Sequence, residues 1–195
     1  MKIYKETVEK PRLIIKYDEC PESPREWSTL GYFLTSDRNY YSPDGKRNPE
    51  IQNIMEETGN EANNLENHIE LMKKRIEEEI GEKVLAIYPI VKYEHSGISY
   101  SLGYQKGFDY SNNGFYIITD KSQKETGIEK DNFEKSIENE LKNYNKYANG
   151  EIYRFTLLDE NGEIEDSCCG FYEIEDIRDN LPEEWKDEDL NQYLI

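Results

Sequence analysis

Two stretches of this chain carry apolar side chains at helical spacing, and they limit what the chain can fold into. The first stripe recurs at intervals of three and four residues and consists of Leu65, Ile69, Met72, Ile76 and Ile80. The inner face of the second helix consists of Phe133, Ile137, Leu141, Tyr144 and Ala148. Such stripes are more typical of core packing than of a groove for a partner. We expect the helices to end at Gly81 and Gly150.

The other apolar residues lie in short runs that are typical of strands. We expect strands at residues 12–17, 27–34, 84–91, 98–102, 114–119, 152–158 and 164–172. The last two should form a hairpin, because Asn161-Gly162 is a strong turn signal, and Pro89 should lie at a bulge or toward an edge. Asn48-Pro49 predicts a short helix that ends near Gly59.

This succession of elements predicts the α+β class: a mainly antiparallel sheet with two principal helices packed on it. We expect residues 1–195 to form a single domain, with an acidic C-terminal segment at residues 173–195. The hydrophobic fraction is only 35%, but 16 Tyr, 6 Phe and 2 Trp add burial and indicate a folded chain. The Tyr excess suits half-exposed strand faces, or alternatively a recognition surface.

The charge of the chain is strongly negative and unevenly distributed. From Asp120 to the end, 22 Asp and Glu stand against 9 Lys and Arg, a net charge of −13; residues 1–119 hold 20 against 15, a net charge of −5. The total is −18, and the pI is near 4.6. Such a surface repels nucleic acid and attracts basic partners, so we expect a basic protein rather than nucleic acid as the partner.

Three cysteines, Cys20, Cys168 and Cys169, make an odd count that is a poor disulfide framework and indicates a reducing compartment. Cys168 and Cys169 fall on a predicted strand, where we expect them to be small buried hydrophobes. The N-terminal residues show no apolar signal core, and no stretch approaches the roughly 20 apolar residues of a membrane span. We therefore expect a soluble cytoplasmic protein with no membrane partner.

A catalytic or metal site has weak support in the sequence. His95, Asp109 and Cys168 could form a nucleophilic site only if the fold brings them together. No Cys-x-x-Cys or His-Glu-x-x-His pattern occurs, and His68 has no second ligand four residues away. We therefore assign no catalytic residue, no metal and no cofactor. The alternative is a small hydrolase of a nucleotide signal that uses His95, Asp109 and Cys168.

Carboxylates gather near the C-terminus around two large aromatic residues, Trp185 and Tyr193. They are Glu173, Glu175, Asp176, Asp179, Glu183, Glu184, Asp187, Glu188 and Asp189. Double-stranded DNA carries one charge per ~1.7 Å of axis, so carboxylates on an ordered surface can imitate it. The alternative is a solvating face. Because pure solubility tails tend to lack large aromatics, Trp185 joins these nine residues as a candidate partner-binding set.

Several motifs together resemble an uncharacterised acidic protein family of phages and mobile elements of Gram-positive bacteria. The motif Tyr-Glu-His-Ser-Gly-Ile at residues 93–98 is similar to the centre of that family, with Glu94 in place of Asp. The other motifs lie at residues 17–31, 108–115, 143–153 and 166–172. The resemblance covers residues 12–172.

Two family features are missing from this chain. A Cys-aromatic-His-basic segment is replaced by residues 32–38, and a Cys-Pro-Trp segment by Lys106-Gly107-Phe108. A family site that used that His or that Cys would be absent here. The resemblance implies a phage setting, in which small acidic proteins often block host defence nucleoproteins. We therefore expect an inhibitor of a CRISPR effector or a restriction enzyme, with a structural or regulatory phage adaptor as a further alternative.

Overall fold

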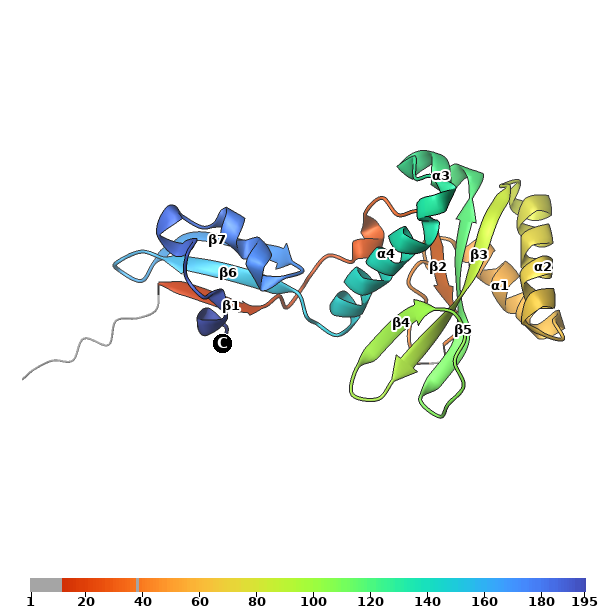
Figure 1. Ribbon diagram of the computed structural model, residues 1–195, viewed down its shortest axis with the longest axis horizontal. Helices are drawn as coiled ribbons and strands as arrows, with labels where there is room; N and C mark the ends of the chain where they lie inside the picture. Colours follow the sequence, from red (N-terminus) through yellow and green to blue (C-terminus); the bar gives the residue numbers. More distant parts are fainter. Residues whose placement is uncertain (1–11, 38) are drawn as a thin grey trace, which may run out of the picture. The chain divides into compact units, whose positions relative to one another are not determined.

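Strands from opposite ends of the sequence form one small sheet. The computed structural model describes residues 12–37 and 39–195, and its contacts divide the chain into two units (Figure 1). We call Met1–Glu22 with Lys146–Ile195 the discontinuous unit and Ser23–Asn145 the inserted unit. The inserted unit therefore separates the two segments that build the discontinuous unit.

The discontinuous unit contains a three-stranded antiparallel sheet in the order β1-β6-β7. Its strands are β1 (Leu13–Tyr17), β6 (Tyr153–Leu158) and β7 (Ile164–Phe171). The β6–β7 hairpin forms around Asn161-Gly162 as predicted, and Gly162 has a φ of 82°. Alternate residues of β1 and β6 point to one face, where Ile15 and Phe155 are fully buried.

The inserted unit contains a four-stranded antiparallel sheet in the order β2-β5-β3-β4. Its strands are β2 (Tyr32–Thr35), β3 (Val84–Glu94), β4 (Ile98–Leu102) and β5 (Tyr110–Thr119). The α+β class with antiparallel strands is thus confirmed, and the strands are divided between two sheets. Pro89 lies where the β3–β4 ladder ends at Ile90–Leu102, so its missing N–H disturbs no ladder bond there.

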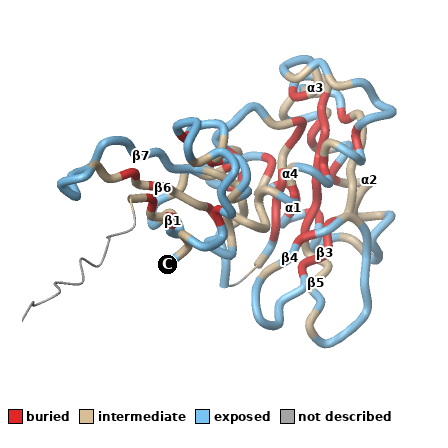
Figure 2. The backbone as a smooth tube through the Cα atoms, turned by 60° about the vertical axis from the view of Figure 1, so that its left-hand side comes forward, coloured by how far each residue is buried: buried red, intermediate tan, exposed pale blue. Residues whose placement is uncertain are grey.

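Helices cover both faces of the inserted unit's sheet. On one face lie α1 (Pro49–Glu61) and α2 (Leu65–Arg75), which continues as a π-helical turn at Ile76–Ile80; on the other lies α4 (Phe133–Ala148). The short α3 (Asp120–Thr126) follows β5. Both predicted amphipathic helices are confirmed, and each ends at its predicted glycine, Gly81 or Gly150, in the left-handed region. Figure 2 shows that buried residues concentrate in the strands.

Two local predictions were wrong. Residues 27–31 do not join the second strand, which begins at Tyr32. In the preceding segment the Gly31 carbonyl accepts from buried Arg25, and the Leu30 N–H donates to Glu140. Cys168 and Cys169 lie on β7 as predicted but are exposed, because the apolar cluster that buries β1 and β6 includes only Phe171 from β7. No helix among the described residues is long and apolar enough to cross a membrane.

Candidate interaction surfaces

The acidic segment, residues 173–195, is a folded cover on one face of the β1-β6-β7 sheet. It consists of three 3-10 turns, at Ile174–Asn180, Glu183–Trp185 and Leu190–Tyr193. Their inward side chains, Ile177, Leu181 and Leu190, are buried in one apolar cluster with residues of β1 and β6. The acidic segment is therefore ordered, and burial of apolar side chains holds it on the sheet.

The outward side of the acidic segment carries every carboxylate that the sequence singles out. All of them are exposed: Glu173, Glu175, Asp176, Asp179, Glu183, Glu184, Asp187, Glu188 and Asp189. Apolar residues point to the sheet while acidic residues point to solvent. The negative surface is therefore displayed on a fixed backbone instead of a loose tail.

Hydrogen bonds hold the turns of this segment in place. Arg178 pairs with Glu175 at 2.7 Å and donates to the backbone carbonyls of Lys186 and Glu188, the latter at 3.0 Å, so it joins successive turns. At the last turn, Asp189 accepts from the side chain and backbone N–H of Asn191, and these bonds hold the Asp189 pKa below its ordinary value. The carboxylates are thus part of what orders the segment.

Basic side chains compensate only part of this charge. Lys146 pairs with Glu173 at 2.6 Å, Lys186 with Glu183 at 3.1 Å, and Arg12 with Glu184 at 3.4 Å. Residues 151–195 contain 15 Asp and Glu but only three Lys and Arg. A large negative surplus therefore remains on this surface.

Trp185 has a different position from the carboxylates around it. Its ring is half-buried and packs edge-on against Tyr193, with the ring centroids 5.4 Å apart. Its indole nitrogen is buried and has no hydrogen-bond acceptor within the described part of the chain. Trp185 therefore packs with the cover, and only part of its ring is available to a partner.

The residues of the alternative hydrolase are separated into the two units. His95 and Asp109 lie side by side on the inserted unit, with Nδ1 and Oδ2 3.9 Å apart, and both side chains are exposed. Cys168 belongs to β7 of the discontinuous unit. A separation of 3.9 Å is too long for the hydrogen bond that links a catalytic base to its orienting acid. The geometry therefore gives the hydrolase no specific support.

No metal site is seen among the described residues: no group of three or more His, Cys, Asp or Glu side chains is placed to hold an ion. His68 instead has a structural role. Its Nε2 lies 2.9 Å from the Met55 carbonyl oxygen, and its ring packs edge-on against Phe115. These contacts join α1 and α2 to the sheet.

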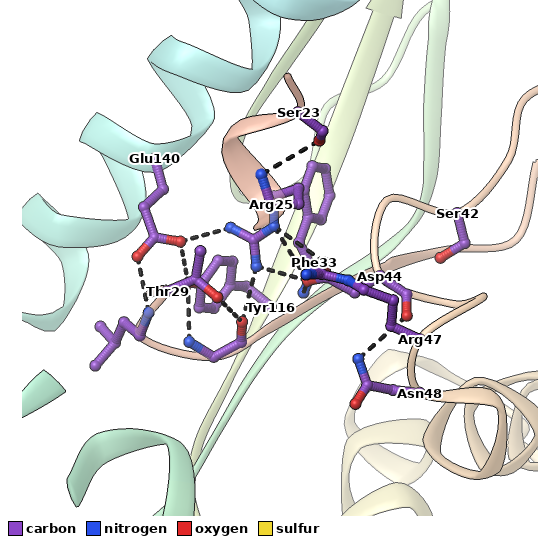
Figure 3. Close-up of polar contacts among 12 residues, drawn as sticks. Ser23, Arg25, Thr29, Phe33, Ser42, Asp44, Arg47, Asn48, Tyr116 and Glu140 are labelled. Carbon is purple, nitrogen blue, oxygen red and sulfur yellow. Dashed lines mark hydrogen bonds and ion pairs between the residues drawn. The ribbon is translucent and has the colours of Figure 1, made fainter. Parts of the chain in front are cut away.

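The inserted unit contains a buried ionic network that sequence reasoning did not identify. Arg25, only 2% exposed, pairs with Asp44 at 2.6 Å and with Glu140 of α4 at 2.6 Å (Figure 3). It also donates to the Gly31 carbonyl, while Glu140 accepts from the Leu30 N–H and from the Tyr116 hydroxyl. A single Arg after a proline gives no sequence signal for such a centre.

Burial alone would lower the Arg25 pKa, but Asp44 and its hydrogen bonds raise that pKa above the ordinary value. Burial and Glu140 raise the pKa of Tyr116 well above its usual range. All groups of the network are hydrogen-bonded to each other or to the backbone. Each group of the network therefore has a hydrogen-bond partner, and the network fixes the segments before and after β2.

Exposed aromatic side chains gather on the loops next to the ends of β3 and β5. They are Tyr93, Tyr104, Phe108 and Tyr110, with Tyr40 and Tyr41 on the loop after β2. Tyr93 and Tyr110 are cross-strand neighbours with ring centroids 5.1 Å apart, and Phe108 is fully exposed. The Tyr excess thus serves half-exposed strand positions and loop tips together, as both interpretations of the sequence allow.

Comparison with known proteins found no family model, no curated protein and no solved structure that matches this chain.

Proposed function

We propose that this chain is a non-enzymatic inhibitor that binds a basic nucleic-acid-binding protein through the outward side of its acidic segment. The observation that carries the proposal is the division of this segment into a buried apolar side and an exposed carboxylate side. Carboxylates on a fixed backbone can occupy a basic channel with less loss of conformational entropy than carboxylates on a flexible tail.

The setting of this function follows from the family resemblance and is part of the proposal. In it, the chain is a phage protein that acts in the cytoplasm of a Gram-positive host. The target is a nucleoprotein of host defence, such as a CRISPR effector or a restriction enzyme, whose nucleic-acid channel is lined with Lys and Arg. Binding there excludes nucleic acid by competition for the same positive charges.

Charge reversal at positions that do not order the segment tests the proposal. Asp179, Glu184 and Asp187 are exposed and form none of the capping bonds described above; Glu184 forms only the exposed ion pair with Arg12, and such surface pairs contribute little to stability. The triple variant Asp179→Lys/Glu184→Lys/Asp187→Lys changes the net charge by six units, two for each residue. We expect it to bind the target at least about tenfold more weakly, or about 1.4 kcal/mol, and to lose inhibition of DNA cleavage.

The matched control reverses three exposed acids of the inserted unit: Glu70→Lys/Glu129→Lys/Glu138→Lys. It changes the net charge by the same six units and should retain inhibition. The target is isolated from phage-infected host cells with the full chain as bait, and the complex is titrated with salt. Equal inhibition by the two triple variants would contradict the proposal, because it would leave the acidic segment without a specific role.

A further inference from the structure

Among the residues that the structure describes, three of the four sheet edges are bonded by other parts of the chain. The edge of β2 is bonded by Asp44, Ser42 and Gln52, through Phe33 N–H, Thr35 N–H and the Thr35 carbonyl. The edge of β4 is bonded at Tyr100 by the Asn145 side chain, which accepts from its N–H and donates to its carbonyl. The edge of β1 is covered by the C-terminus, where the Ile195 N–H donates to Ile15.

The outer edge of β7 differs from these three. Among the described residues no strand or bridge lies on that side of β7, and seven of its eight residues are exposed. Ser167 turns its N–H away from β6, because this group donates to the neighbouring Asp166 carboxylate at 2.8 Å. Since backbone groups alternate along a strand, Cys169 turns its N–H and carbonyl to the same outer side. The Cys169 carbonyl accepts from the Cys168 thiol at 3.7 Å. On its outer side β7 therefore presents the Ser167 carbonyl and the Cys169 N–H to an incoming strand.

The side chains along this edge are small, and acidic residues lie at its ends. Ser167, Cys168, Cys169 and Gly170 leave room for another backbone to approach. No Lys or Arg occurs between Arg154 and Arg178, whereas this interval contains Asp159, Glu160, Glu163, Glu165, Asp166, Glu173, Glu175 and Asp176. Gly170, with a φ of 85°, forms the bulge at which the β6–β7 register shifts.

We propose that the outer edge of β7 binds a basic, extended segment of a protein partner as a fourth strand. Main-chain hydrogen bonds to the Ser167 carbonyl and the Cys169 N–H supply affinity, and the flanking carboxylates select Lys and Arg side chains. A second copy of this chain is a poor occupant, because β7 contains Glu165 and Asp166 but no Lys or Arg and so offers no basic side chain to the flanking carboxylates. The proposal rests on the basic partner of the proposed function and adds how that partner is held.

A pair of substitutions at one residue separates strand addition from simple charge attraction. Cys169→Pro removes an outward N–H without removing a donor to β6, whereas Cys169→Ala removes only the thiol. The probe is a synthetic octapeptide of alternating Arg and Val. Its control has the same charge but carries N-methyl groups on alternate backbone amides. The peptide edge that contains these amides therefore cannot donate hydrogen bonds.

Peptide affinity and amide hydrogen exchange of the full chain are measured together. We expect the unmodified peptide to slow exchange of the Cys169 amide at least tenfold, and the N-methylated peptide to bind at least tenfold more weakly. Cys169→Ala should bind as the unchanged protein does, and Cys169→Pro should lose binding while β6 amides stay protected. If Cys169→Pro unfolds the sheet, the comparison of the two peptides on the unchanged protein still tests strand addition.

Equal binding of the two peptides would overturn the proposal, and so would a Cys169 amide that is already protected in the free protein, whether by a second copy or by the chain itself. The test of strand addition can be distinguished from the test of the proposed function. The triple variant at Asp179, Glu184 and Asp187 leaves β7 intact and should still take up the peptide. Loss of inhibition in that variant together with equal binding of both peptides would reject only the strand addition.

Discussion

The two units of this chain place their charged side chains in different environments. Every charged or polar residue that is buried among the described residues belongs to the inserted unit, where Arg25 and Lys92 each pair with two carboxylates. The buried residues of the discontinuous unit are all apolar within the described part of the chain. One unit uses ion pairs to fix its loops, while the other keeps its charges on the surface.

Net charge follows the same division. The discontinuous unit has 72 residues with 20 Asp and Glu against 9 Lys and Arg, a net charge of −11; the inserted unit has 123 residues with 22 against 15, a net charge of −7. The smaller unit thus has the larger charge. Its core is a single apolar cluster, so its carboxylates lie at the surface, where Glu175 and Asp189 also help to order the acidic segment.

The largest effect on stability is expected in the inserted unit, from Arg25→Ala. This change leaves Asp44 buried without its main partner, so we expect the free energy of unfolding to fall by about 3–5 kcal/mol in denaturant titration. The control is Arg47→Ala, which removes the exposed partner of Asp44 and should cost less than about 1 kcal/mol. A similar loss of unfolding free energy in both variants would show that the buried ion pair is no more important than an exposed one, and the contrast between the two units would fail.

A smaller effect is expected from Ile177→Val, which removes one methyl group from the cover of the discontinuous unit. It should cost about 0.5–1.5 kcal/mol, as should Ile137→Val in the inserted unit, since both side chains are fully buried. Hydrogen exchange should show that each variant weakens amide protection in its own unit. A loss that spreads equally over both units would mean that the two unfold as one, and the comparison between them would fail.

The smallest effect is expected from His95→Ala and Cys168→Ala, one in each unit. Both side chains are exposed, so we expect stability changes within about 0.5 kcal/mol and unchanged protection of the phage in plaque assays on a defended host. Lost protection by folded variants would instead favour the hydrolase, and would require the two units to share a site.

The periodicity of apolar residues predicts where a helix or strand lies along the chain when one of its faces is buried. The stripes from Leu65 and from Phe133, and the Asn161-Gly162 turn, are of this kind. The pattern does not tell which strands share a sheet, because alternation at Leu13 is the same whether its partner is nearby or at Leu157. The division into two sheets was therefore not predictable from alternation.

The candidate surfaces show the same limit. The carboxylates of the acidic segment were found because surface charge is a property of composition. The half-buried position of Trp185 was not found, since it depends on Tyr193 and on a cluster built by residues far away in the sequence. The Arg25 network joins residues 115 positions apart, and the exposure of Cys168 depends on how far the apolar cluster extends over the sheet.

The pairing of β1 with β6 has a consequence during protein synthesis. Leu13 faces Leu157, so β1 leaves the ribosome well before its partner strand exists. All strands of the inserted unit lie between Ser23 and Asn145 and are complete earlier. We expect β1 to stay unpaired, and dependent on chaperones, until the β6–β7 hairpin and the acidic segment have been synthesised and can pack against it.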